Sequence, residues 1–113
     1  MDQGQHLEVI HLLLEGMANK DRAMLEEAIL KNALLFHMTG RSETREEYIQ
    51  DILDGTLNYY DYRIIGSSEN EVKVRLLAKV YGGNKSWWTL AMSIKYTVED
   101  NLTKIKENKV RMA

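Results

Sequence analysis

The sequence predicts an α+β domain in which three N-terminal helices pack on a curved antiparallel β-sheet. Apolar residues recur at helical spacing in much of the first half of the chain, and from residue 56 onward they alternate with polar residues as in strands. Short turn sequences separate the later apolar runs. Helices grouped on one face of an antiparallel sheet give an α+β fold, and 113 residues suit one domain spanning residues 1–113.

A pair of helices is predicted at the start of the chain. Residues 5–18 carry apolar side chains on a single helical stripe, formed by Leu7, Ile10, Leu13, Leu14 and Met17. Asp21 is a suitable N-cap for a second helix that extends to residue 30. Because the break between them is short, we expect a helical hairpin that buries one shared face.

A short strand and a capped third helix follow. Residues 33–38 form an apolar run that is too short for a stable helix, so we expect a strand. Thr44 and Glu47 have the spacing of a capping box for a helix over residues 45–53. Gly55 then supplies the left-handed residue that commonly ends a helix.

The second half of the chain predicts a four-stranded meander with strands at residues 57–65, 72–81, 87–98 and 103–112. The connections between them are short and rich in Gly, Asn, Ser and Asp, which is hairpin chemistry. Alternation in the third of these strands predicts an inner face made of Trp88, Leu90, Met92, Ile94, Tyr96 and Val98. The opposite face carries Trp87, Thr89, Ala91 and Ser93.

Composition excludes several classes of site. The chain has no Cys, so it can form no disulfide, thiolate metal site or Cys nucleophile. Its formal net charge is −2, and the late basic residues alternate with apolar ones as on a solvated strand face, which does not favour nucleic-acid binding. The first residues lack the pattern of a signal peptide, and no apolar run could span a membrane. We therefore expect a soluble, cytoplasmic protein.

Two segments carry a resemblance to a known superfamily. Residues 36–40 read Phe-His-Met-Thr-Gly and precede the helix with Tyr48, which is followed by Gly-Thr-Leu-Asn-Tyr-Tyr at residues 55–60. Residues 82–90 combine a glycine turn with a tryptophan strand. With the order of elements, these segments resemble the nuclear transport factor 2-like superfamily, which includes ketosteroid isomerase-like and polyketide cyclase-like proteins with a cystatin-like cone. The His-Met-Thr-Gly turn resembles that of a bacterial branch.

The resemblance implies a cone-shaped pocket between the helices and the concave face of the sheet. It also implies a homodimer that forms through the convex, outer sheet face. The outward side chains Trp87 and Ala91, with Leu77 and Tyr81 nearby, agree with this, because exposed apolar patches usually mark interfaces.

Four residues are the candidates for binding a ligand in this pocket: His37, Tyr48, Tyr60 and Trp88. His37 is also the candidate catalytic residue, because a histidine titrates near neutral pH and can move a proton. Tyrosines offer phenolic donors, and Trp88 offers an apolar wall. A small apolar or aromatic molecule is the expected partner.

Three functions remain open at this point. The first is a small-molecule-binding pocket without readable catalysis. The second is an isomerase, dehydratase or cyclase that uses His37 and a Tyr as its acid–base pair, and the third is a dimerising interaction domain with a closed pocket. An isomerase would need a carboxylate on an apolar strand face, and the meander shows none there. We expect no cofactor and no metal, since His6 and His11 fall on different helix faces.

Overall fold

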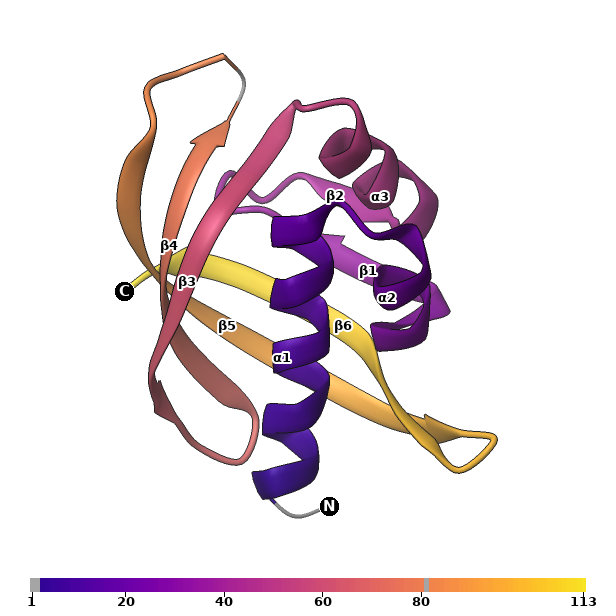
Figure 1. Cartoon of the computed structure of the whole chain (residues 1–113). Helices are drawn as coiled ribbons and strands as arrows, with labels where there is room; N and C mark the ends of the chain where they lie inside the picture. The colour runs from indigo at the N-terminus through magenta and orange to yellow at the C-terminus, as the bar shows by residue number, and fades with distance from the viewer. Residues whose placement is uncertain (1–2, 81) are drawn as a thin grey trace.

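The computed structural model describes residues 3–80 and 82–113 and shows three helices and a six-stranded curved sheet (Figure 1). The α+β class predicted from the sequence is confirmed. In chain order the elements are α1 (Gln3–Asn19), α2 (Arg22–Ala28), β1 (Ile29–Phe36), β2 (Ser42–Thr44), α3 (Arg45–Leu53), β3 (Leu57–Ser67), β4 (Glu71–Val80), β5 (Ser86–Glu99) and β6 (Leu102–Met112). Tyr81, expected near the outer face, lies outside the described residues.

Local sequence signals set the helix ends. Asp21 caps α2 by accepting a hydrogen bond from the Met24 amide. The capping box is present at α3, where the Thr44 hydroxyl accepts from the Glu47 amide and the Glu47 carboxylate accepts from the Thr44 amide. Gly55 has a φ of +88°, a left-handed conformation that favours glycine. The third helix therefore occupies the residues that its caps predict.

The transition from α2 to β1 differs from the prediction. The second helix stops at Ala28 rather than at residue 30, and the strand expected over residues 33–38 begins at Ile29. Ile29 pairs with Ile105 of β6, so sheet formation replaces the last helical turn. A short strand, β2, was not expected at all; it pairs with β1 across the turn that contains Gly40.

The sheet order is β2-β1-β6-β5-β4-β3. Strands β3 to β6 form the predicted antiparallel meander. Strand β1 lies parallel to β6, with Leu35 opposite Asn108. The expectation of a wholly antiparallel sheet is therefore wrong at this pair, because the chain joins β1 to β6 through most of the fold rather than through a hairpin.

Helix α1 lies against the concave side of the sheet and contacts β3 and β6, while α3 contacts β1 and β3 (Figure 1). Leu90, Met92 and Ile94 of β5 are buried on this side, as the alternation predicts. Val98, expected on the same face, is exposed because it lies near the end of the β5–β6 hairpin, which extends beyond the helices (Figure 1). One face of the sheet thus meets the helices along most of its length.

The outer sheet face carries an exposed tryptophan between two arginines. Trp87 is 39% exposed, and the guanidinium carbons of Arg63 and Arg75 lie 5.7 and 5.4 Å from its ring centroid. Such cation–π contacts stabilise an exposed ring without covering it. A homodimer through this face stays a prediction.

No helix among residues 3–80 and 82–113 combines the length and the apolar character that a membrane-crossing segment needs.

The attachment of α1 to the sheet generates a stability prediction. Leu13 of α1 is 1% exposed within the core, whereas Leu34 of β1 is 47% exposed. We expect Leu13→Ala to lower the free energy of unfolding by about 2–5 kcal/mol through lost burial and the cavity left behind. Leu34→Ala removes the same atoms from a half-exposed site, so it should cost less than Leu13→Ala, about 1 kcal/mol. Urea denaturation measures both, and equal losses would contradict the packing described.

Candidate functional site

A cavity of about 100 Å³ lies between the concave face of the sheet and the helices α1 and α3. Met17 of α1 and Tyr48 of α3 close one side, and the turn after β1 contributes His37, Met38 and Thr39. Inner-face residues of β1, β3, β4, β5 and β6 form the rest of the wall. Met38 and Thr39 are exposed, so the cavity meets solvent at this turn.

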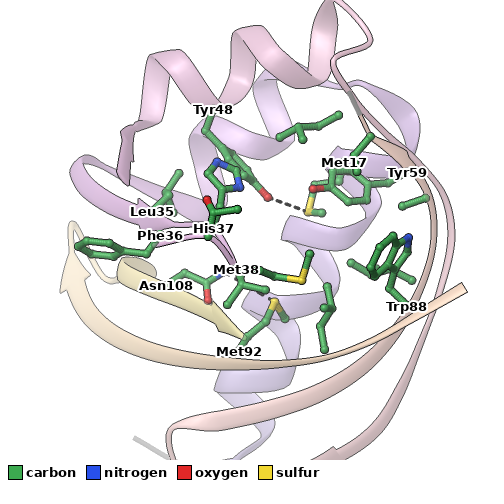
Figure 2. A pocket seen from close by; sticks show the side chains of 17 residues that line it. Met17, Leu35, Phe36, His37, Met38, Tyr48, Tyr59, Trp88, Met92 and Asn108 are labelled. Atoms are coloured by element: carbon green, nitrogen blue, oxygen red, sulfur yellow. Dashed lines mark hydrogen bonds between the residues drawn. The ribbon is translucent and has the colours of Figure 1, made fainter. Parts of the chain in front are cut away.

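Three polar side chains of the cavity wall lie on one side. Figure 2 shows Tyr48, His37 and Asn108 on the side formed by α3, the β1 turn and β6, with Trp88 on the opposite side. Most of the other lining residues are aliphatic side chains or methionines. The cavity is therefore mostly apolar with a few polar groups, which is the usual arrangement of a small-molecule site.

Three of the four residues predicted for the site, His37, Tyr48 and Trp88, line this cavity. Tyr60 does not, and the prediction for it is wrong. Strand β3 has an irregular register between Tyr59, which faces Ala78, and Asp61, which faces Leu77. The extra residue turns Tyr60 outward.

Tyr59 takes the inner position that was expected for Tyr60. Tyr60 is 46% exposed, and the Lys85 ammonium lies 4.2 Å from its ring centroid. Period-two alternation could not reveal this, because a bulge exchanges the faces of the residues on either side of it.

His37 is paired with a buried carboxylate that the sequence analysis missed. Its Nε2 is hydrogen-bonded to Oε1 of Glu43, which is 5% exposed. The pairing follows from the β1–β2 hairpin, where the His37 amide donates to the Arg41 carbonyl at 2.9 Å and Glu43 lies opposite Leu35. We expected no carboxylate in the middle of an apolar strand face, and Glu43 does not lie on one: it is buried from the short polar strand β2. A predicted strand pair across the Gly40 turn would have indicated that Glu43 lies beside His37.

Arg41 and Asp51 extend the His37–Glu43 pair toward solvent. The Arg41 guanidinium lies 3.1 Å from Glu43 and 3.3 Å from Asp51. Burial is the largest influence on Glu43 and opposes its ionisation, but hydrogen bonds with Asp51 and His37 and the charges of His37 and Arg41 outweigh it. The pKa of Glu43 is therefore held below its ordinary value.

The pKa of Asp51 is shifted in the opposite direction, upward. Burial, a hydrogen bond with Glu43 and the negative charge of Glu43 raise the pKa of Asp51 from 3.8 to about 6. Below about pH 6 the pair therefore holds a proton on Asp51, with Glu43 as the more ionised partner. An ionised Glu43 favours the proton on Nε2 of His37, which leaves Nδ1 as the ring's basic atom.

Two polar groups of the wall donate hydrogen bonds to methionine sulfurs. The Tyr48 hydroxyl, which is also hydrogen-bonded with Tyr59, donates to Sδ of Met17 at 3.4 Å. Asn108 Nδ2 donates to Sδ of Met92 at 3.7 Å. A thioether is a weak acceptor, and burial together with nearby Tyr59 raises the pKa of Tyr48 well above its usual range. Tyr48 is therefore a neutral hydrogen-bond donor at physiological pH.

Two further polar atoms in the wall are buried and have no partner among the described residues, Nε1 of Trp88 and Oδ1 of Asn108. Asn108 was not singled out in the sequence, and Tyr59 was not among the four ligand-binding candidates. Asn108 lies in a strand whose polar residues all looked solvated, and its burial comes from β1 and β5 on either side. Residues 3–80 and 82–113 contain no group of three His, Asp or Glu side chains arranged to hold a metal ion.

Solved structures share this architecture along the whole chain. A nuclear transport factor 2-like protein from Cytophaga hutchinsonii matches with a TM-score of 0.69 and 18% identity over 100% of both chains. A nuclear transport factor 2-like protein from Rhodospirillum rubrum, described as of unknown function in nutrient uptake, matches with a TM-score of 0.67 and 19% identity. The match covers 95% of this chain and 97% of the other chain. A third, from Silicibacter pomeroyi, has a TM-score of 0.62 and 14% identity over 100% of both.

No protein-family model and no curated protein matches the chain. Identities below one fifth with such full coverage show the nuclear transport factor 2-like fold. The bacterial branch with a His-Met-Thr-Gly turn stays a prediction.

The raised pKa of Asp51 predicts a pH-dependent stability. Between pH 3.8 and about 6 the folded protein holds a proton on Asp51 that the unfolded chain has released, so stability falls as pH rises through this window. Asp51→Asn should remove this loss of folding stability. Compared with the wild type, the variant should therefore lose less stability between pH 5 and pH 7. We expect a difference on the order of 1 kcal/mol, roughly 4 °C in Tm.

Thermal denaturation of both proteins between pH 5 and 7.5 measures this difference. Glu43, Arg41 and Asp54 act on Asp51, and Asp51→Asn also changes the hydrogen bond to Glu43, so the difference between the two curves reports the coupled Asp51–Glu43 pair. Glu69→Gln, in an exposed turn, is the control. Parallel curves for the wild type and Asp51→Asn would contradict the raised pKa of Asp51.

Proposed function

We propose that this chain is a binding domain for a small apolar or aromatic molecule, held in the cavity between the sheet and α1 and α3. The observation that supports it is an internal, mostly apolar space with a few polar groups in its wall. His37 and Tyr48 would contact the polar part of the ligand, and Trp88 its apolar part. Tyr59 replaces Tyr60 in this set.

The size of the cavity limits the ligand to at most one ring, and a ring enters only when the wall adjusts. An apolar cavity of roughly 150 Å³ accepts benzene, whereas drug-sized ligands occupy about 300–1,000 Å³. The space here is about 100 Å³, and three of its lining residues are methionines, Met17, Met38 and Met92. Because methionine side chains are unbranched and adaptable, they can enlarge the space by changing rotamer.

A specific observation favours acid–base catalysis as a second candidate function. His37 lines the cavity while its Nε2 is hydrogen-bonded to buried Glu43, so Nδ1 is the ring nitrogen left to act as a base. In this proposal Glu43 takes the place that the sequence analysis gave to a tyrosine. Tyr48, whose ring centroid lies 6.0 Å from that of His37, would donate a hydrogen bond to a developing oxyanion.

Filling the cavity should abolish ligand binding. Ala78 of β4 lines the cavity, whereas its neighbour Leu77 faces the outer side of the sheet. Ala78→Ile introduces a strand-compatible side chain into the space and should weaken binding of one-ring aromatics by at least about tenfold, with a Tm close to that of the wild type. Leu77→Ile is the matched control and should bind normally.

Ligand-observed NMR with a panel of one-ring compounds, supported by thermal shifts, measures this effect. Binding that survives Ala78→Ile would place the ligand elsewhere, and a wild type that binds no member of the panel would refute the proposed function.

The catalytic candidate has its own test. Isomerases and many related enzymes begin by removing a proton from carbon beside a carbonyl group. We expect the wild type to speed deuterium exchange at the acetophenone methyl group in heavy water, followed by proton NMR. His37→Gln and Glu43→Gln should slow that exchange about 100-fold or more, the usual contribution of a general base.

His11→Gln on the exposed surface of α1 is the control and should exchange at the wild-type rate. Exchange at the buffer rate in the wild type, or a rate unchanged by His37→Gln, would eliminate catalysis of this kind and leave the binding proposal intact.

A further inference from the structure

The charge of the cavity wall restricts the ligand, an argument that rests on the proposed binding function. None of the residues that line the cavity is Lys, Arg, Asp or Glu. The titratable lining residues are His37, which is already paired with Glu43, and the tyrosines Tyr48 and Tyr59. A ligand that carries a full charge would lose its hydration on entry and find no free counter-charge.

The Asn108 side chain points to one kind of polar group. It is 4% exposed, its Nδ2 has only the weak sulfur acceptor of Met92, and its Oδ1 has no partner among the described residues. A buried amide is stable when both ends are hydrogen-bonded and costly when they are not. Asn108 therefore requires a partner that both donates and accepts.

The neighbours of Asn108 in the sheet do not supply that partner. Its cross-strand partners are Leu35 on β1 and Ile94 on β5, and both are buried apolar residues. The remaining side of the amide belongs to the cavity wall. A group bound in the cavity is thus placed to complete its hydrogen bonds.

We infer that the ligand is an uncharged one-ring molecule with a single polar head, such as a carboxamide or a hydroxyl, that exchanges hydrogen bonds with the Asn108 amide. The head displaces the Met92 sulfur as the acceptor from Nδ2 and donates to Oδ1. Since Asn108 and Trp88 stand on opposite sides of the cavity, the ring of the ligand extends toward Trp88 (Figure 2). Asn108 is then the residue that selects the head group.

Four probes of nearly equal shape test this inference. Benzamide is neutral with a donor and an acceptor, benzoate is an anion, benzamidinium is a cation, and ethylbenzene has no polar head. Isothermal titration calorimetry at pH 7 should give benzamide a Kd at least about tenfold below that of either ion. Benzamide should also bind more tightly than ethylbenzene.

Two variants of Asn108 make the test specific. Asn108→Leu should raise the Kd of benzamide about tenfold, whereas the Kd of ethylbenzene should stay the same or fall. Asn108→Asp keeps the shape of the side chain and should shift the preference toward benzamidinium. Asn32→Leu, on an exposed position of β1, is the matched control and should keep the wild-type order. Circular dichroism checks that each variant folds. If Asn108→Leu does not fold, the probe order of Asn108→Asp tests the role of Asn108.

The outcomes separate this inference from the proposed function. If benzoate or benzamidinium binds as tightly as benzamide, or if neither Asn108 variant changes the order of the probes, the inference is overturned while binding in the cavity stands. If ethylbenzene binds most tightly to the wild type, the role of Asn108 is overturned as well. If no probe binds, the proposed function fails and the inference fails with it.

Discussion

The parallel pairing of β1 with β6 is the constraint on which the rest of the site depends. It brings the first strand of the chain to the last, so that Leu35 lies opposite Asn108 and the turn that carries His37 lies at the edge of the cavity. The hairpin back through β2 then places Glu43 against His37. Because β1 and β6 are far apart in the chain, their pairing is a non-local contact, so the site depends on the complete sheet rather than on one local segment.

The cavity combines two environments that ordinarily exclude one another. Its interior is apolar and adaptable because methionines line it, whereas its rim holds a chain of ionisable groups from His37 through Glu43 and Asp51 to Arg41. The rim groups satisfy each other, so their charges do not have to be balanced by whatever occupies the interior. This division explains how the domain can hold a buried carboxylate beside a cavity whose wall has no acidic or basic residue apart from His37.

Much of the fold was readable from local signals. The third helix carries both its caps in the sequence, and the four strands of the meander start and end within two residues of the predicted positions. The errors arose where partners distant in sequence decide the outcome. Ile29 joined a sheet instead of a helix, Glu43 became buried through a strand pair that was not foreseen, and Tyr60 exchanged places with Tyr59 at a bulge. Periodicity describes one segment at a time and contains no information on such pairings.

The bulge at Tyr60 has a consequence for how this fold can diversify. Strand β3 directs both Tyr59 and Tyr62 to the inner side of the sheet because a single additional residue, Tyr60, interrupts its alternation. Loss of Tyr60 would restore regular pairing with Tyr59 still opposite Ala78 and Tyr62 still opposite Leu76, so the inner side of the strand would stay the same. A single-codon deletion at this bulge would therefore alter the outer surface of the domain without altering the cavity wall.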